Sequence, residues 1–331
     1  MITCSSPLWQ EIEHRTYKMK TITIIVIALV VTALSACAAR TNSENNCMAD
    51  YITVYTQESK PTDELSEVPV YITIAGVQYS TRLIELDLSG MQLSDKDIDS
   101  IRYMTNLTNL VLRDNLLADI TALTGLTNLE TLLLNGNRIS DVTPLAGLTN
   151  LTFLSLARNQ ISDITPLDSL TNLTALFLPD NQINDIIALT GLTNLMELAL
   201  GANQINDLAP LAGITGLTWL HLAGTQTSDI APLTGLSNLE WLSLSDNQIN
   251  DITALTGLTN LTELYLSSNQ VNNIAPLTEL TNLTKLGLSN NKISDIAPLA
   301  GLLDLELLDI AYNPITNWKP VDHIDWVNGR P

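Results

Sequence analysis

Leucine returns along most of this chain at a fixed interval of twenty-two residues. Each interval opens on the pattern L-x-x-L-x-L-x-x-N-x-I, as at Leu151, Leu154, Leu156, Asn159 and Ile161. The alternating leucines predict a short β-strand with one face buried. Ten intervals follow one another without a change of length, beginning at Leu107, Leu129, Leu151, Leu173, Leu195, Leu217, Leu239, Leu261, Leu283 and Leu305; an irregular copy of twenty-four residues precedes them at Leu83.

Such a period predicts a repeat architecture in which every interval is one coil. A single coil carries too few aliphatic side chains to offset the entropy lost when its backbone is ordered, so the coils must stack and share a core. We therefore expect an α/β solenoid with a curved parallel sheet on its concave face. The convex face should hold short 3-10 or irregular segments. The fold predicted here is that of a leucine-rich repeat.

The polar positions of the repeat also have structural explanations. An asparagine follows nearly every predicted strand, and we expect these side chains to form an internal ladder of bonds to the backbone; they are Asn115, Asn137, Asn159, Asn181, Asn203, Asn247, Asn269, Asn291 and Asn313. An aspartate precedes the I-x-x-L segment of most repeats, where it suits a capped turn; these are Asp119, Asp141, Asp163, Asp185, Asp207, Asp229, Asp251 and Asp295. Much of the acidity thus belongs to the scaffold.

Five segments follow from these patterns. Residues 1–36 are predicted to be a signal peptide, because Lys18 and Lys20 precede the apolar run 22–34 and a small-residue site. The leader is either unusually extended or begins in reality at Met19. Residues 37–66 are polar and predict a flexible tether. An N-terminal cap at 67–82, in which the alternating residues 68–74 predict one strand, precedes eleven repeats at 83–316 and a C-terminal cap at 317–331. Trp318 and Trp326 are expected to close the last coil.

The residues between the leucines of each predicted strand must face outward, on the concave side. Between residues 105 and 304 every aromatic side chain falls in one of these two outward slots. We expect exposed rings there, and exposed rings favour a binding site. The predicted partner-binding residues are Phe153, Phe177, Trp219, His221, Trp241 and Tyr265, together with the charged Glu197, Glu263 and Arg158. The propensity of aromatic residues for strands is the structural alternative.

Charge and composition narrow the function further. The formal charge of −20 disfavours nucleic acid as a partner, because a phosphate backbone needs clustered lysine and arginine. The three cysteines, Cys4, Cys37 and Cys47, all precede the repeats, and the three histidines are scattered. The sequence therefore predicts no metal site, no cofactor and no catalytic group of the kinds that hydrolases use. We expect the protein not to be an enzyme.

Two family resemblances add to this interpretation. Residues 159–173, Asn-Gln-Ile-Ser-Asp-Ile-Thr-Pro-Leu-Asp-Ser-Leu-Thr-Asn-Leu, resemble the repeats of internalin-like bacterial surface proteins, and also those of intracellular phosphatase-regulating subunits of the SDS22 type. The first resemblance implies display on the cell surface and a protein partner gripped by the concave sheet. Leu34-Ser35-Ala36-Cys37 resembles the lipobox of bacterial lipoproteins, which implies cleavage before Cys37 and lipidation of its sulfur.

The leading hypothesis is thus an adhesion module anchored in the cell envelope through Cys37 and facing outside the cytoplasm, or secreted if Cys37 carries no lipid. It is expected to be monomeric and to bind a protein of a host or of a neighbouring cell. A glycan-binding surface module and an intracellular regulatory subunit are the alternatives.

Overall fold

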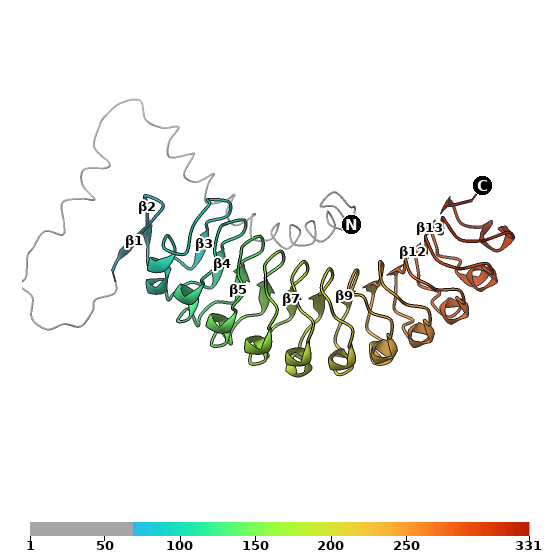
Figure 1. Ribbon diagram of the computed structural model, residues 1–331, viewed down its shortest axis with the longest axis horizontal. Helices are drawn as coiled ribbons and strands as arrows, with labels where there is room; N and C mark the ends of the chain where they lie inside the picture. The colour runs from blue at the N-terminus through green and yellow to red at the C-terminus, as the bar shows by residue number, and fades with distance from the viewer. Residues whose placement is uncertain (1–68, 331) are drawn as a thin grey trace, which may run out of the picture. The chain divides into compact units, whose positions relative to one another are not determined.

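The computed structural model describes residues 69–330. The predicted signal peptide, the tether and Cys37 lie outside these residues. The described part opens on an antiparallel hairpin of β1 (Tyr71–Ile74) and β2 (Val77–Ser80) and continues as a curved row of coils (Figure 1). Within this range the second sheet has twelve parallel strands, ordered as in the sequence from β3 to β14.

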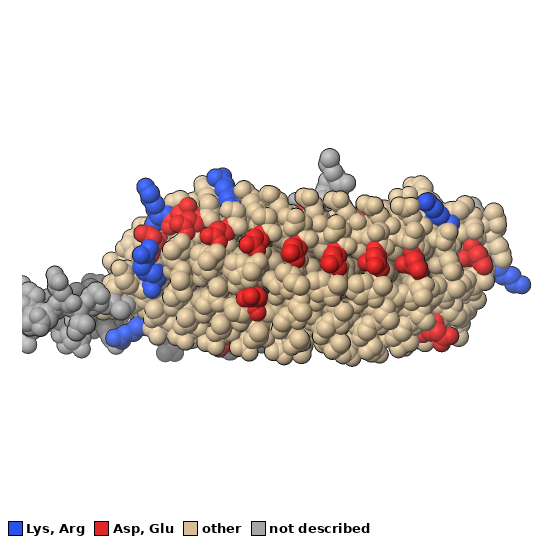
Figure 2. All heavy atoms as spheres, turned by 60° about the horizontal axis from the view of Figure 1, so that its bottom comes forward, with Lys and Arg blue, Asp and Glu red and all other residues tan. Residues whose placement is uncertain are grey.

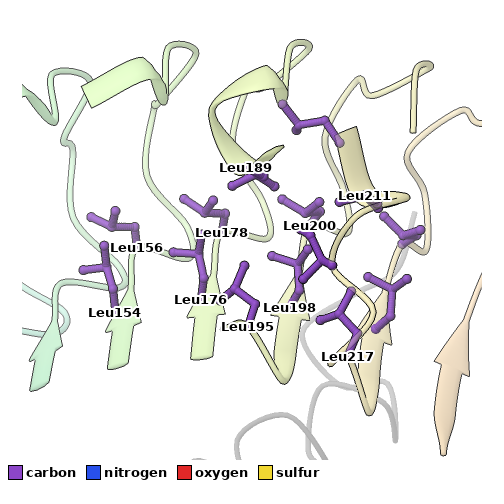
Figure 3. Close-up of a cluster of buried hydrophobic side chains, with 14 of the residues drawn as sticks. Leu154, Leu156, Leu176, Leu178, Leu189, Leu195, Leu198, Leu200, Leu211 and Leu217 are labelled. Carbon is purple, nitrogen blue, oxygen red and sulfur yellow. The ribbon is translucent and has the colours of Figure 1, made fainter. Parts of the chain in front are cut away.

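Each strand of the large sheet is three residues long, and its middle residue faces the core. The strands are β3 (Glu85–Asp87), β4 (Asn109–Val111), β5 (Thr131–Leu133), β6 (Phe153–Ser155), β7 (Ala175–Phe177), β8 (Glu197–Ala199), β9 (Trp219–His221), β10 (Trp241–Ser243), β11 (Glu263–Tyr265), β12 (Lys285–Gly287), β13 (Leu307–Asp309) and β14 (Trp326–Asn328). Leu154 and Leu156 show the arrangement, since both turn inward and are fully buried, as are Leu176 and Leu178 of the next coil (Figure 3). The predicted fold is confirmed.

Short 3-10 helices return the chain along the convex side of each coil. They are η1 (Asp99–Tyr103), η2 (Thr121–Leu123), η3 (Thr143–Leu145), η4 (Thr165–Leu167), η5 (Ile187–Gly191), η6 (Ala209–Leu211), η7 (Ala231–Gly235), η8 (Thr253–Leu255), η9 (Ala275–Leu277), η10 (Ala297–Gly301) and η11 (Lys319–Val321). Within residues 69–330 no helix is long and apolar enough to cross a bilayer.

The aspartates before these turns form a row along the convex side, where Figure 2 shows a line of acidic side chains. In each case the carboxylate accepts a hydrogen bond from the first backbone N–H of the turn, as Asp163 Oδ1 does from Thr165 N at 2.8 Å. The hydroxyl of Thr165 and, to a smaller extent, that backbone bond lower the pKa of Asp163, because both stabilise its charged form. The structural role predicted for this row is confirmed.

The asparagine ladder is also present, and it ties neighbouring coils together. Asn159 Oδ1 accepts from the backbone N–H of Ile139 at 3.0 Å, while its Nδ2 donates to the carbonyls of Leu134 and Leu156, both at 3.0 Å. One amide thus satisfies buried backbone groups of two coils, which would otherwise lose their hydrogen bonds to water without replacement.

One coil replaces the ladder asparagine with Thr225 and the buried isoleucine with Thr227, and both threonines are fully buried. Their hydroxyls lie 3.1 Å apart; Thr225 Oγ1 donates to Leu222 O at 3.0 Å and Thr227 Oγ1 donates to Ile205 O at 2.9 Å. Asn247 Oδ1 accepts from both backbone N–H groups. The pair therefore substitutes one satisfied polar network for another, and strand pairing continues through it.

The two ends differ from the expectation in detail. At the first end, Ala75 and Gly76 adopt positive φ and turn the chain into a second strand, so that the cap is a hairpin rather than one strand. At the other end, Trp318 packs against the core, as do Ile315 and Val327. Trp326 was expected to close the coil as well, and that expectation is wrong: it occupies an outward slot of β14 beside Leu307 and is half exposed. Val321 and Ile324 fill the interior instead.

Candidate functional site

The concave face gathers the predicted aromatic residues from five of the six consecutive strands β6 to β11, all except β8. In-register pairing sets Trp219 directly beside Trp241, and Ser243 between His221 and Tyr265. Phe153 and Phe177 come from β6 and β7. None of these side chains belongs to the aliphatic core, because the strands turn their middle leucines to that side. We call Phe153, Phe177, Trp219, His221, Trp241 and Tyr265 the aromatic ladder.

The ladder is continuous along the solenoid. Phe153 and Phe177 stack with ring centroids 5.3 Å apart, and Phe177 lies 6.0 Å from Trp219. The two indoles stack at 4.5 Å with only 14° between their planes. Tyr265 then contacts Trp241 at 5.6 Å. The intervening outward slot at Ala199 holds a methyl group, which leaves room for Phe177 to reach Trp219 across β8.

The expectation that these rings would be exposed is wrong for most of them. Trp219 and Trp241 expose only 2% of their surface, Phe177 and His221 only 7%, and Phe153 and Tyr265 are partly buried. Outward side chains in neighbouring coils stand about 5 Å apart, so large rings pack on one another as cross-strand pairs do in any sheet. The concave position of the rings follows from the repeat, but their exposure does not.

His221 lies in the middle of the ladder, with its ring centroid 6.1 Å from those of both Trp219 and Trp241. Its ring extends over Gly201 of the preceding coil: a Cβ there would lie 2.2 Å from His221 Cε1. Burial lowers the pKa of His221 to about 4, since the imidazolium would lose its hydration in this site. The ring is therefore neutral at physiological pH.

Charged residues flank the rings as predicted. Glu197 precedes Trp219 in the same row of outward slots and Glu263 follows Trp241. Glu263 accepts a hydrogen bond from Tyr265 Oη at 2.8 Å and pairs with Lys285 Nζ at 2.9 Å. Arg158 lies at the end of the strand face. Burial raises the pKa of the nearby Asp180, and the positive charge of Arg158 partly opposes that rise.

Four polar atoms of this face are shielded from water and have no hydrogen-bond partner: Trp219 Nε1, Trp241 Nε1, His221 Nδ1 and Ser243 Oγ. A buried donor without an acceptor costs roughly 1–3 kcal/mol. Ser243 was not among the predicted site residues, because nothing in the sequence separates it from the other serines of the same slot. The described residues hold no group of three or more His, Cys, Asp or Glu side chains placed for a metal ion.

Known proteins that resemble the chain are leucine-rich-repeat proteins. The family model described as leucine-rich repeats in two copies matches residues 127–169, 237–279 and 281–323. An internalin from Listeria monocytogenes, inlF, is 30% identical with a TM-score of 0.64, and the match covers 77% of this chain and 91% of that one. The chain belongs to the internalin family. Internalin C2 of the same species is 40% identical over 55% of this chain and 82% of its own, with a TM-score of 0.54.

A more distant resemblance links this internalin-family chain to a receptor. The plant peptide hormone receptor RGFR1, solved in complex with RGF2, is 25% identical with a TM-score of 0.62; the match covers 70% of this chain and 40% of the receptor. No curated protein sequence matches the chain significantly. The comparisons together support a protein-binding leucine-rich-repeat module.

Replacing Gly201 by alanine is expected to destabilise the protein by about 1–3 kcal/mol, the usual cost of overpacking. The new methyl group must displace the His221 ring, whose Cε1 would lie 2.2 Å away, and it would also crowd the Ala223 carbonyl oxygen at 3.0 Å. Urea unfolding of Gly201→Ala measures the loss, and Gly213→Ala is the control because its Cβ would meet nothing within 4 Å. Adding His221→Ala should recover part of the loss; equal stability of both glycine variants would contradict the packing described here.

The folding stability should depend on pH through His221. Its folded pKa of about 4 lies below the usual 6.5, so the unfolded state binds more protons between these values. The contribution of the neutral ring is complete above pH 6.5 and is lost as the pH falls toward 4, by roughly 3 kcal/mol in total. Between pH 7 and 4.5 the free energy of unfolding of the wild type should therefore fall by about 2–3 kcal/mol more than that of His221→Phe. Parallel pH profiles for the two proteins would show that His221 is not buried in its neutral form.

Proposed function

We propose that this internalin-family chain is a non-enzymatic adhesion or receptor-binding module of the bacterial cell surface, which grips a protein partner with its aromatic ladder. The observation that carries the proposal is the concentration of every large ring of residues 105–304 on one face of the sheet, outside the aliphatic core. The core cluster of the described coils is made of non-aromatic side chains instead.

The ladder has the residue composition of a binding hot spot. Tryptophan, tyrosine and arginine dominate the energetics of protein interfaces, and here two indoles lie together at the centre of the strand face. Their stacking at 4.5 Å holds both rings in one arrangement, so little side-chain freedom remains to be lost on binding. The flanking Glu197, Glu263 and Lys285 would form a polar rim.

The comparisons favour a protein as the partner. The repeat belongs to the internalins, and the plant receptor with the same fold was solved with its peptide hormone. The stacking also disfavours the glycan alternative, because a sugar ring stacks on a free aromatic face. Here each indole covers one face of the other, while Phe177 and Tyr265 contact the pair from the two sides.

A double substitution tests the ladder as a binding site. Trp219→Ala/Trp241→Ala should reduce capture of a surface-protein partner at least tenfold in a pull-down from the proteins of host or neighbouring cells, since loss of each hot-spot ring costs about 2 kcal/mol or more. Trp326→Ala is the matched control, because this indole is half exposed at the far edge of the sheet. Circular dichroism must show that all variants are folded, and undiminished capture by the double variant would sink the proposed site.

Attachment to the cell envelope through Cys37 has a separate test, since it is carried by the sequence alone. In a bacterial host the full chain should incorporate labelled palmitate and sediment with membranes. Cys37→Ser should abolish both, while Cys47→Ser should change neither. Sedimentation of the Cys37→Ser protein with membranes, or no label on the wild type, would contradict lipidation at this cysteine.

A further inference from the structure

The hairpin at the first end of the solenoid has a strand edge that no other strand of residues 69–330 covers. β1 and β2 form a two-stranded sheet of their own, joined by a tight turn whose two residues both have positive φ. Thr81 N donates to Val70 O at 3.0 Å, and this bond fixes the alternation of the pairs along the hairpin. The backbone N–H and C=O groups of Gln78 and Ser80 therefore point away from β1, toward the open side of β2.

The two edges of the hairpin differ in their protection. On the β1 edge the outward backbone positions are Pro69, Tyr71 and Thr73, and the proline has no N–H to offer. β1 also lies beside η1 of the first coil. On the β2 edge Gln78 and Ser80 bring neither a charge nor a proline, the usual means by which natural sheets prevent edge pairing. The β2 edge is therefore the one that is open to another strand.

The surface around this edge is uncharged and partly apolar. Residues 69–81 contain no charged side chain, although the whole chain has a formal charge of −20. Val70, Tyr71 and Val77 expose 55%, 60% and 48% of their surface. A basic segment finds no carboxylate on this hairpin to pair with, and an acidic one is repelled by the chain as a whole. Two copies of the chain repel each other over most of their surfaces, but an uncharged end with an open strand lets them meet.

We propose that the chain forms a symmetric dimer by antiparallel pairing of β2 with β2 of a second copy. The strand suits a twofold axis at Tyr79, because Gln78 of each copy then lies opposite Ser80 of the other. These two positions carry the outward backbone groups, so each such pair exchanges two hydrogen bonds across the interface. Ser80 O has a second lone pair for this purpose, beside the bond that it accepts from Leu83 N at 3.2 Å.

The pairing closes at two copies. The twofold axis uses the β2 edge of both chains, so the outer edges of the resulting four-stranded sheet are the two β1 strands, each protected by Pro69 and η1. A two-stranded hairpin is only marginally stable alone, and the added strands support it. The dimer replaces the expectation of a monomer and is separate from the proposed function, because it does not involve the strands of the aromatic ladder. A pair of copies carries two ladders, which raises the avidity for a partner displayed many times on a cell.

Proline substitutions on the two edges test the dimer. The full chain with Cys4, Cys37 and Cys47 changed to serine, so that neither a lipid nor a disulfide contributes, should show a monomer–dimer equilibrium in sedimentation velocity. High salt should favour the dimer, because it screens the repulsion between the acidic chains. Gln78→Pro should weaken dimerisation about 10- to 100-fold, since it removes one interfacial N–H from each copy. Thr73→Pro is the matched control: Thr73 is the cross-strand partner of Gln78 and loses the equivalent N–H on the β1 edge.

A charged variant serves where proline disturbs the hairpin itself. Gln78→Glu keeps the shape and every N–H of the residue but places two carboxylates near the axis. The dimer of this variant should be weaker than the parent dimer at low salt and should recover at high salt. Thr73→Glu adds the same net charge on the other edge and should behave much more like the parent. Circular dichroism shows whether each variant is folded.

Cysteine variants test the register of the two strands. In the same serine background, Gln78→Cys of one copy lies opposite Ser80→Cys of the other, with Cα atoms about 5.5 Å apart, which a disulfide can bridge. Two copies of the same variant place their cysteines diagonally, beyond the roughly 7 Å that a disulfide allows. Oxidation of an equimolar mixture should therefore give crosslinked dimers, while either variant alone should remain largely uncrosslinked.

The opposite results are equally clear. A chain that sediments as a monomer at every concentration would overturn the dimer. Equal weakening by the substitutions at Thr73 and Gln78 would overturn β2 as the interface. Crosslinking of the single cysteine variants as fast as the mixture, or of none of them, would overturn the register with its axis at Tyr79. The aromatic ladder and its own test remain in each case, because no substitution touches β6 to β11.

Discussion

The three-residue strand with a leucine at its centre is the constraint on which the whole molecule depends. Leu154 and its equivalents enter the core in every coil, and the parallel pairing of β3 to β14 fixes their register. A shift of one residue would turn these leucines out and the outward residues in, which a buried core does not permit. Because of this, any residue beside the central leucine must face the concave side in line with its equivalents. The aromatic ladder is a direct consequence of that alignment.

Stability is shared between coils in the same way. Asn159 bonds backbone groups of its own coil and of the preceding coil. The network of Thr225 and Thr227 shows that the interior accepts a different chemistry provided that each hydroxyl finds a partner. The interior is thus strict about satisfied polar groups. The polar atoms around Trp219 and Trp241 that have no hydrogen-bond partner contrast with this satisfied interior.

The periodic features could be predicted from the sequence because each depends on residues close along the chain or one period away. The strand positions, the asparagine ladder, the turns opened by aspartate and the concave position of the rings all follow from counting residues. The burial of Trp219, Trp241 and Phe177 could not be predicted in this way, because it depends on which side chains meet across strands. Room for His221 comes from Gly201, and contact between Phe177 and Trp219 depends on the small side chain of Ala199. The position of Trp326 was also predicted wrongly. The last segment adds one more strand, β14, to the sheet, and Trp326 therefore takes an outward slot instead of covering the last coil.

The packing of the ladder changes how a binding site on this face must work. Separately exposed rings would offer their faces and would be ordered only by a ligand. A stacked ladder holds its rings in one arrangement and buries most of their surface, at the cost of donors left without acceptors. Natural proteins retain local costs of this kind where function repays them. If the indoles served the scaffold alone, stacking would favour them but the shielded N–H groups would favour phenylalanine at both positions. The choice of tryptophan at both positions therefore favours a role for these rings beyond the scaffold.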